Sequence, residues 1–231
     1  MSSSSSAGDW GRRNREAWND LSRTGRDHIW GRGPAPYLDE WKKELGEQLA
    51  AAPRILDTAA SEGRNLEFLR GLSPQVFACD ASRHALGRLE PAQRARSVVC
   101  DLAQMPFRCG SLGLVLMNDV VETLPDPAKV LREVLRVLRP GGILLCNIPS
   151  GDEEIAGMDM EPLPEGGFLY RGRYFYRFHE RSDAARLLRR SGLEIVGSRM
   201  TCWDEGPHAG FREQSHRHRS TVFLARRPTS A

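Results

Sequence analysis

PRILDTAASEGRNLEFLR, residues Pro53–Arg70, is the stretch that decides the fold. Ile55 and Leu56 predict a short strand, the small residues after them predict a tight turn, and the apolar positions from Leu66 predict a helix closed by Gly71. Such a turn lets the backbone approach a ligand closely, and the helix N-terminus directs free N–H groups toward the same place. We therefore expect the strand, turn and helix to form a ligand-binding site.

Two carboxylates around this turn indicate the kind of ligand. Asp80 follows a second strand-like run, Gln75–Cys79, and lies 23 residues beyond Asp57. A carboxylate about 20 residues past such a turn is where α/β folds bind ribose hydroxyls. Asp57 would repel the pyrophosphate of a dinucleotide but would favour a cationic ligand. Together the two residues favour S-adenosylmethionine over NAD.

Five motifs in the expected order resemble those of the Rossmann-like, S-adenosylmethionine-dependent methyltransferases. The first is similar to the family pattern Leu-Asp-x-Gly-x-Gly-x-Gly, although Ala59 and Ser61 replace two of its glycines. In addition, Thr123 stands where many relatives have His. The resemblance implies an α/β fold with a mostly parallel seven-stranded sheet, helices on both faces and an N-terminal helical lid. The five motifs are Ile55–Leu66, Val76–Ser82, Val99–Leu102, Leu114–Asp119 with Leu124–Pro127, and Leu138–Gly142.

The resemblance also implies the cofactor, the reaction and the binding residues. The cofactor is S-adenosylmethionine, with S-adenosylhomocysteine as product, and the methyl group goes to an oxygen, nitrogen, sulfur or carbon of a small molecule. Asp101 would accept a hydrogen bond from the adenine amino group, and Leu102 would offer its backbone N–H to the ring. Asn118 lies just past a buried strand, where ligands of open α/β sheets bind. The predicted cofactor-binding residues are Trp30, Asp57, Thr58, Ala59, Ser61, Gly63, Asp80, Ala81, Asp101, Leu102 and Asn118.

The sequence offers four candidates for a general base. An alcohol or phenol acceptor needs proton removal, and Asp119, His179, His208 and His216 are of the right type for that role. Of these, the predicted catalytic residues are Asp119, His179 and His216. A His-rich segment is equally well explained as a solvated surface. The histidines lack the spacing of a helical metal-binding pair, so the sequence predicts no metal site.

Three other functions stay open. The altered glycine positions and Thr123 fit a methyltransferase-like protein that binds S-adenosylmethionine for non-methyl catalysis such as cyclisation. A non-catalytic binding module is the second alternative. RNA methylation ranks last, because no basic stripe interleaved with aromatic residues supports nucleic-acid binding.

Composition sets the remaining limits. The 231 residues, 40% of them hydrophobic, suit one α/β domain with an appended cap. Residues 171–231 hold 13 Arg against 6 acidic residues, which reflects either a general preference for Arg or an Arg-lined pocket for an acidic acceptor. Five cysteines without a Cys-x-x-Cys pair indicate neither disulfides nor zinc. No apolar run approaches the ~18 residues of a membrane span, and no secretory signal is present, so we expect a cytoplasmic protein without membrane partners.

The expected organisation follows from these patterns. Residues 1–8 are predicted to be disordered, residues 9–52 to form lid helices with Trp30 over the cofactor, and residues 53–231 to form the cofactor-binding domain. Insertions at about 150–180 and 201–220 are predicted to contact the substrate, the first as a strand pair or an irregular insertion. Expected elements outside the motifs are helices at 12–21, 37–49 and 182–191 (capped by Ser182), strands at 143–148, 194–200 and 221–225, and a long loop at 203–219.

Overall fold

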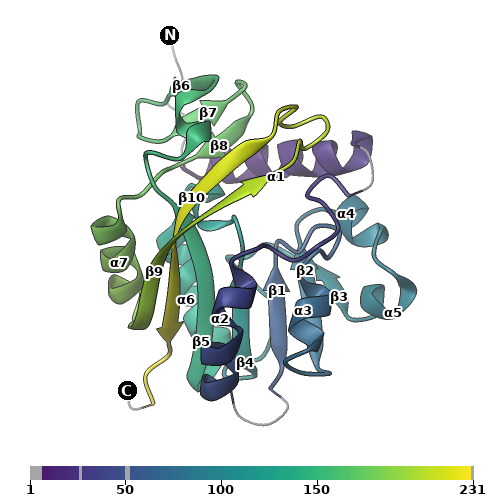
Figure 1. Cartoon of the computed structure of the whole chain (residues 1–231), viewed down its shortest axis with the longest axis vertical. Coiled ribbons are helices and arrows are strands. Elements are labelled where there is room, and N and C mark those ends of the chain that lie inside the picture. The colour runs from purple at the N-terminus through teal and green to yellow at the C-terminus, as the bar shows by residue number, and fades with distance from the viewer. Residues whose placement is uncertain (1–6, 26–27, 50–52, 230–231) are drawn as a thin grey trace.

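A seven-stranded sheet forms the centre of the computed structural model, which describes residues 7–25, 28–49 and 53–229 (Figure 1). The strand order is β3-β2-β1-β4-β5-β10-β9. The first five strands are parallel, and β10 pairs antiparallel with both β5 and β9. This architecture confirms the predicted fold class. The strands are β1 Ile55–Thr58, β2 Val76–Asp80, β3 Ser97–Val99, β4 Leu112–Met117, β5 Leu138–Pro149, β9 Glu194–Glu205 and β10 His216–Arg226.

The strand order reverses between β1 and β4, and this reversal positions the ligand site. Every residue of both strands is buried, as expected of parallel strands covered on both faces. Thr58, the last residue of β1, lies beside Met117, the last residue of β4. The residues that follow these two strands therefore emerge side by side at the carboxyl edge of the sheet, where open α/β folds bind ligands.

Helices cover both faces of the sheet (Figure 1). One core cluster packs α6 and α7 against the sheet, and a second packs α2 and α3 on the other face. The helix α6 begins at Pro127, as predicted, and the Asp126 carboxylate accepts a hydrogen bond from the Lys129 backbone N–H at 3.0 Å, which caps it. The helices are α1 Ala7–Thr24, α2 Leu38–Gln48, α3 Leu66–Arg70, α4 Arg83–Gly87, α5 Pro91–Arg94, α6 Pro127–Val137 and α7 Arg181–Arg190, with short 3₁₀ turns η1 Val121–Thr123 and η2 Glu154–Gly157.

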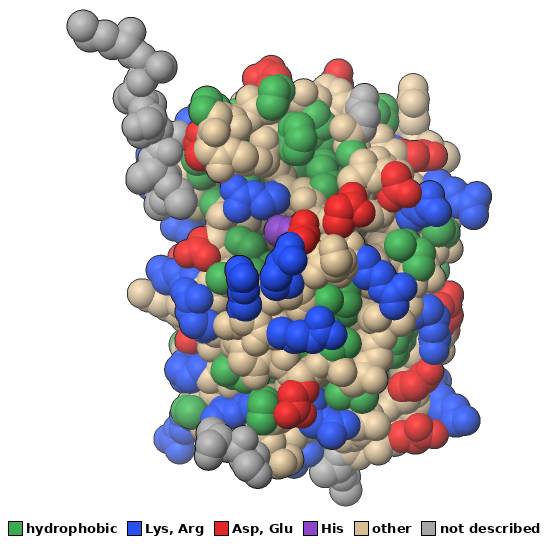
Figure 2. All heavy atoms as spheres, turned by 90° about the vertical axis from the view of Figure 1, so that its left-hand side faces the viewer, with side chains coloured by type: hydrophobic (Ala, Val, Ile, Leu, Met, Phe, Trp, Pro, Cys, Tyr) green, Lys and Arg blue, Asp and Glu red, His purple; other side chains and the backbone are tan. Residues whose placement is uncertain are grey.

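The outer side of the sheet is strongly basic. The helix α7 turns Ala184 and Leu188 toward the core and exposes its four arginines. Figure 2 shows Lys and Arg side chains spread across this face of the molecule. A charged outer face is expected of a helix that packs only one side against a sheet.

A second layer lies above the carboxyl edge of the sheet (Figure 1). Three short strands, β6 Met160–Pro162, β7 Phe168–Tyr170 and β8 Tyr174–Tyr176, form a small antiparallel sheet that contacts α1. We call α1, this small sheet and residues 206–215 the roof. Residues 150–178 thus contain three strands, one more than the predicted pair.

Asn14 joins α1 to the rest of the roof. Its side-chain N–H donates to the Thr123 carbonyl at 2.7 Å, and its side-chain oxygen accepts from the Phe175 backbone N–H at 3.1 Å. Aromatic side chains pack beside it, with the ring centroids of Trp18 and Tyr174 4.6 Å apart. The N-terminal helix is therefore fixed by specific buried contacts.

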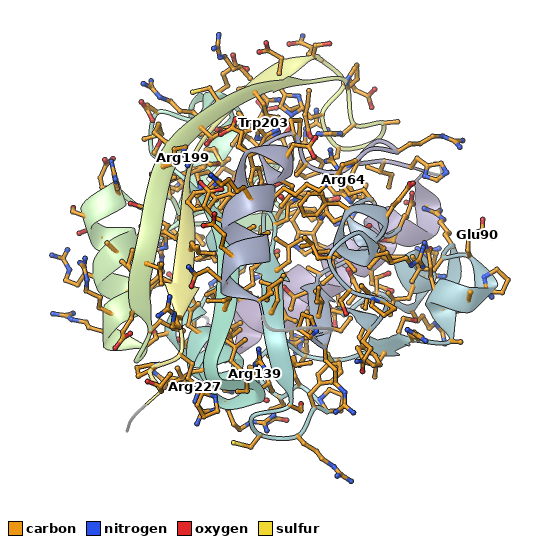
Figure 3. The ribbon with its side chains drawn as sticks, turned by 60° about the horizontal axis from the view of Figure 1, so that its bottom comes forward. Arg64, Glu90, Arg139, Arg199, Trp203 and Arg227 are labelled. Carbon is orange, nitrogen blue, oxygen red and sulfur yellow. The ribbon has the colours of Figure 1, made fainter. Side chains whose placement is uncertain are left out.

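Figure 3 shows labelled side chains at the two ends of the sheet. Arg139 and Arg227 lie at the end away from Arg64 and Trp203. The Arg227 guanidinium donates to the Leu138 carbonyl at 2.6 Å and so satisfies a backbone acceptor where α6 passes into β5. Within the described residues, no helix combines the length and the apolar character that crossing a membrane requires.

Several element boundaries differ from the predictions. Ala7 and Gly8 already belong to α1, so they are not disordered as expected, and residues 1–6 lie outside the described residues. The predicted Ser182 cap is wrong, because α7 begins one residue earlier and Glu180 occupies the cap position. Likewise, β5 begins at Leu138 and includes the Pro-Gly-Gly turn that was expected to precede it.

The expected long loop at 203–219 is also wrong. The strands β9 and β10 continue to pair through this region, with His216 opposite Glu205 and His218 opposite Trp203. Only residues 206–215 connect them. Backbone pairing between the two strands satisfies their N–H and C=O groups, which a loop of that length would leave to water or side chains.

Candidate functional site

The turn after β1 has the shape that the family motif requires, despite its altered residues. Backbone φ angles are positive at alternate positions: 49° at Ala59, 48° at Ser61 and 79° at Gly63. Glycine adopts such angles freely, whereas a Cβ atom makes them costly. Gly63 has a second constraint, since a Cβ atom there would lie 2.6 Å from the Leu89 side chain. Ala59 and Ser61 therefore hold a strained backbone in the conformation of the family glycines.

Asp80 fixes this turn from below. One carboxylate oxygen accepts from the Ser61 backbone N–H at 2.8 Å, and the other accepts from the Ser82 backbone N–H at 2.7 Å. Burial raises the pKa of Asp80, and these two N–H donors oppose that rise. Asp80 is thus held beside the turn, as the sequence predicted for a ribose-binding carboxylate.

A cavity of about 510 Å³ opens at the carboxyl edge of the sheet, beneath the roof. Its volume falls within the usual range for small-molecule sites, roughly 300–1,000 Å³. Among the described residues, Asp57, Thr58, Gly63 and His179 are the predicted site residues that do not line it. The predicted residues that line it are Trp30, Ala59, Ser61, Asp80, Ala81, Asp101, Leu102, Asn118, Asp119 and His216.

The four residues outside the lining have separate explanations. Asp57 and Thr58 belong to β1 and are fully buried, and the Thr58 hydroxyl donates to the Leu116 carbonyl at 2.7 Å. Gly63 lies in the turn itself, where its positive φ angle shapes the backbone. His179 follows β8, and burial lowers its pKa below the ordinary value. The structure therefore does not bring His179 together with the other candidates.

Asp57 supplies a test of whether a cationic cofactor fits this site. Both of its carboxylate oxygens are buried, and neither has a hydrogen-bond partner among the described residues. Burial, reinforced by the neighbouring Asp80 carboxylate, raises the pKa of Asp57 to about 8. A buried carboxyl group without partners is unfavourable unless a positive charge compensates it. The residues present therefore fit a cofactor that carries ammonium and sulfonium groups.

Asp101 follows β3 and lines the same cavity. One carboxylate oxygen accepts from the Ala103 backbone N–H at 2.9 Å, and the other lies 3.0 Å from the Arg15 guanidinium. Arg15 belongs to α1, so this ion pair links the roof to the sheet across the cavity. The sequence did not predict that link, because Arg15 and Asp101 are far apart in the chain.

Asn118 and Asp119 are fixed at the centre of the cavity edge by a polar network. The Tyr37 hydroxyl donates to the Asn118 side-chain oxygen at 2.7 Å. The Asn147 side-chain oxygen accepts from the Asp119 backbone N–H at 2.8 Å, and the amide groups of Asn118 and Asn147 both donate to the Asp119 carboxylate. Both Asp119 carboxylate oxygens are thus oriented by amide donors.

Glu122 is a cavity residue that sequence reasoning missed. Its side chain is 2% exposed, and its Oε2 atom has no partner among the described residues. Burial and the nearby Asp119 carboxylate raise the pKa of Glu122 well above the ordinary value. An acidic residue directly after the apolar pair Val120-Val121 was the signal that could have identified it.

The part of the cavity beneath the roof is aromatic. Phe211 lies centrally, with ring centroids 5.4 Å from Trp18 and 5.3 Å from Trp30. Trp30 also packs edge-on against His208 at 5.0 Å, and Tyr176 lines the same compartment. Planar apolar ligands suit such a compartment, because aromatic rings pack favourably against its walls.

The β9–β10 hairpin forms a polar wall of the cavity. Glu205, His208, His216 and His218 line it together, although only His216 was in the predicted site. Burial lowers the pKa of His216 to about 4. His218 is also buried, which lowers its pKa, but hydrogen bonds to Glu153 and Glu205 outweigh burial and raise it to about 10.

The structure gives no support to an Arg-lined pocket for an acidic acceptor. From the Arg-rich residues 171–231, Arg212 is the arginine found in the described cavity lining, and its guanidinium lies 3.1 Å from Glu154. Arg64 is likewise paired with Glu205 at 2.8 Å. The acidic partners neutralise these cations.

Comparison with known proteins agrees with this geometry. A family model described as a methyltransferase domain matches residues 56–146. The chain is 32% identical over 141 residues to the demethylmenaquinone methyltransferase of Clavibacter sepedonicus. This alignment covers 57% of this chain and 52% of that protein. The chain is 30% identical over 143 residues to the tRNA 5-carboxymethoxyuridine methyltransferase of Escherichia coli strain K12, which covers 58% and 51%.

A solved structure extends the likeness to nearly the whole chain. The 1,6-didemethyltoxoflavin-N1-methyltransferase of Burkholderia thailandensis, with bound 1,6-didemethyltoxoflavin and S-adenosylhomocysteine, superposes with a TM-score of 0.69 at 18% identity. The match covers 99% of this chain and 93% of that one. By contrast, the chain spans about half the length of the curated relatives it matches. Residues 56–146 thus match a methyltransferase domain, and the solved structure shares the fold of nearly the whole chain.

Proposed function

We propose that the protein transfers a methyl group from S-adenosylmethionine to a small, planar acceptor bound beneath the roof. One observation carries the proposal: a single cavity joins the turn residues Ser61 and Asp80 to the aromatic compartment around Trp30 and Phe211. Asp119 lies on the same cavity wall. A donor and an acceptor bound at the two ends would thus meet in a shared, partly enclosed space, which is the main requirement for a displacement reaction.

The proposed roles of the cofactor-binding residues follow from their positions. Asp80 would accept hydrogen bonds from ribose hydroxyls, and Asp101 would accept one from the adenine amino group. Asp57 is buried under the turn, and the charge of a positively charged ligand would lower its pKa, so that the ionised carboxylate adds negative potential beneath that ligand. When bound, the cofactor supplies the reactive methyl group on its positive sulfur. The chain's own tasks are to align the two ligands and to exclude water.

Asp119 is the general base that we propose for a hydroxyl acceptor. Its carboxylate is oriented by the side chains of Asn118 and Asn147 and lines the cavity. The two histidines predicted as catalytic are less suitable. His179 lies outside the cavity lining, and the ring nitrogens of His216 are within hydrogen-bond distance of the Gln214 carbonyl and of His218 Nε2.

Similar proteins support a small-molecule acceptor without identifying it. The names of the Clavibacter and Burkholderia proteins each state a small-molecule substrate, and the name of the Escherichia coli protein states a tRNA. The basic helix α7 contributes no residue to the cavity lining within the described part of the chain, which argues against RNA as the acceptor. A cytoplasmic location stays a prediction from the sequence.

Calorimetry with S-adenosylmethionine and S-adenosylhomocysteine is the first test. We expect both to bind, and Asp80→Asn and Asp101→Asn to weaken binding by at least about tenfold through the loss of charge-assisted hydrogen bonds. The exposed Asp39 on α2 offers a matched control, since Asp39→Asn should leave affinity unchanged. Thermal melts of each variant check folding. Failure of the wild-type protein to bind at millimolar ligand would leave the non-catalytic binding module.

Radiolabelled methyl donor with a panel of planar hydroxyl, amine and thiol compounds is the second test. We expect label to appear in an organic-soluble product, and Asp119→Asn to lower kcat for hydroxyl acceptors more than for amines. Cofactor binding without transfer to any acceptor, together with turnover of a substrate without loss of the methyl group, would support the non-methyl alternative. Transfer to RNA with steeply salt-dependent affinity would instead favour the nucleic-acid alternative.

A further inference from the structure

We propose that Glu205, His208, His216 and His218 bind a divalent transition-metal ion, with zinc as the best fit. The four side chains come from the β9–β10 hairpin and line one wall of the cavity. Each offers one ligand atom, and all four ligand atoms lie within 4.8 Å of one another. The site is distinct from the cofactor residues and does not depend on the proposed methyl transfer.

Three of the six separations between ligand atoms are close to those of tetrahedral coordination, and all six are at most 4.8 Å. His216 Nε2 lies 2.9 Å from His218 Nε2. Glu205 Oε2 lies 3.2 Å from His208 Nε2 and 3.3 Å from His218 Nε2. Tetrahedral zinc with bonds of about 2.0–2.2 Å places its ligand atoms roughly 3.3–3.5 Å apart. An ion could therefore enter with small side-chain adjustments.

The other nitrogen of each imidazole ring has a fixed acceptor. His208 Nδ1 lies 2.9 Å from the Ile29 carbonyl, and His216 Nδ1 lies 3.1 Å from the Gln214 carbonyl. His218 Nδ1 lies 3.2 Å from the Glu153 carboxylate. Such acceptors hold a proton on Nδ1, so that Nε2 can bind a metal; for His218 the metal would replace the Nε2 proton that faces Glu205. All three rings thus present the same nitrogen toward one point.

The surroundings keep these ligands in place. His208 and His216 are each 5% exposed, and the Trp203 ring stacks on His218 with centroids 4.7 Å apart. Arg64 pairs with the other oxygen of Glu205 at 2.8 Å, which leaves Oε2 directed at the histidines. Ordered rings in a buried wall lose little conformational entropy when an ion binds.

Ligand chemistry and charge select the class of ion. Three imidazoles and one carboxylate suit zinc and its neighbours in the first transition series better than magnesium or calcium, which prefer oxygen ligands. The carboxylates of Glu205 and Glu153 place negative charge beside the ion, and Arg64 shares the Glu205 carboxylate. Because the chain supplies four ligands, we expect a closed site that stiffens the cavity wall, in contrast to catalytic zinc sites that keep an open position.

The spacing of the four ligands, Glu205-x₂-His208-x₇-His216-x-His218, matches no helical metal-binding pattern. His216 and His218 alternate with exposed arginines on β10, so both histidines face the same side of the strand. The antiparallel register then places His216 opposite Glu205. The sequence therefore suggested no metal site, since the ligands converge through strand pairing.

Metal analysis of the wild-type protein tests the proposal directly, without cofactor or acceptor. After dialysis against micromolar zinc and then buffer, we expect about one zinc ion per chain and a rise in melting temperature of several degrees, because an ion that binds only the folded state stabilises it. Cobalt in place of zinc should give the intense visible absorption of a tetrahedral site. Chelator treatment should reverse both effects.

Variants separate a metal site from an ion-pair network. His208→Ala and Glu205→Gln should abolish stoichiometric zinc and the cobalt spectrum, and Glu153→Gln should weaken affinity by roughly 10- to 100-fold, as loss of an outer partner does. His84→Gln, on the remote helix α4, is the matched control and should bind like the wild type. If His208→Ala fails to fold, Glu205→Gln and the chelator titration of the wild type still decide the question.

The contrary results are equally specific. No zinc after dialysis, or zinc that remains undiminished in both His208→Ala and Glu205→Gln, would overturn the proposal and leave only a hydrogen-bonded cluster in which His218 pairs with two carboxylates. A six-coordinate cobalt spectrum would refute the closed site. Since these measurements need no S-adenosylmethionine, their outcome is independent of the proposed methyl transfer.

Discussion

Replacing Ala59 or Ser61 by glycine should stabilise the protein, although glycine usually destabilises. Both residues have φ near +50°, a conformation that costs an L-residue about 1–2 kcal/mol. The added backbone entropy of glycine in the unfolded chain offsets about 0.4–1 kcal/mol of that gain. The expected net effect is about 0.5–1 kcal/mol for each substitution. For a chain of this size, that corresponds to an increase of about 1–4 °C in melting temperature.

Ala60 provides the matched control for this prediction. It lies between the two strained residues, has no positive φ and is 5% exposed in the core. Ala60→Gly should therefore destabilise by about 1 kcal/mol, through lost burial and added chain entropy. Urea denaturation followed by circular dichroism, without cofactor, measures all three variants. Destabilisation by Ala59→Gly and Ser61→Gly comparable to that of Ala60→Gly would refute the view that the turn stores backbone strain.

Two further predictions concern buried polar groups. Asn14→Ala should lower the free energy of unfolding by about 1–3 kcal/mol, because the Thr123 carbonyl and the Phe175 N–H lose their partner. Limited proteolysis should then cleave α1 faster. An unchanged cleavage rate would contradict the prediction. Asp57 has a folded-state pKa of about 8 against an ordinary 3.8, so its stabilising contribution is greatest below pH 4 and declines as pH rises from 4 to 8. Asp57→Asn should flatten the decline in stability over that window, measured by denaturant titration at several pH values, and identical pH profiles for the two proteins would show that Asp57 is ionised at neutral pH in the folded state.

The part of the cavity lining beside the turn was predictable because its signals are local. A short apolar run followed by small residues predicts a strand and a turn, and the carboxyl ends of parallel strands meet at one edge. Asp80, Asp101 and Asn118 each follow such a run and each line the cavity. Only the burial of Asp57 and Thr58 below the lining required three-dimensional information.

The contacts in the rest of the cavity were not predictable, because they join residues that are far apart in the chain. Tyr37 reaches Asn118 across 81 positions of the chain, and Asn14 reaches Thr123 across 109. No periodic pattern encodes such pairs. A weaker signal did exist in the HRHRS run that begins at His216, whose alternation of inward and outward side chains is typical of a strand. The sequence analysis interpreted this run as a loop, because the side chains that face inward are polar histidines and not the apolar residues that usually mark a strand.

The roof lies entirely outside residues 56–146, the span that the family model matches. Under the proposed function, most donor contacts lie within this span and most acceptor contacts outside it, so the two can diverge separately. A chimaera that carries the N-terminal helix and the later insertions of a relative should acquire that relative's acceptor preference while it keeps its own affinity for the donor. New acceptor preferences would then evolve by changes in the roof, while residues 56–146 stay the same.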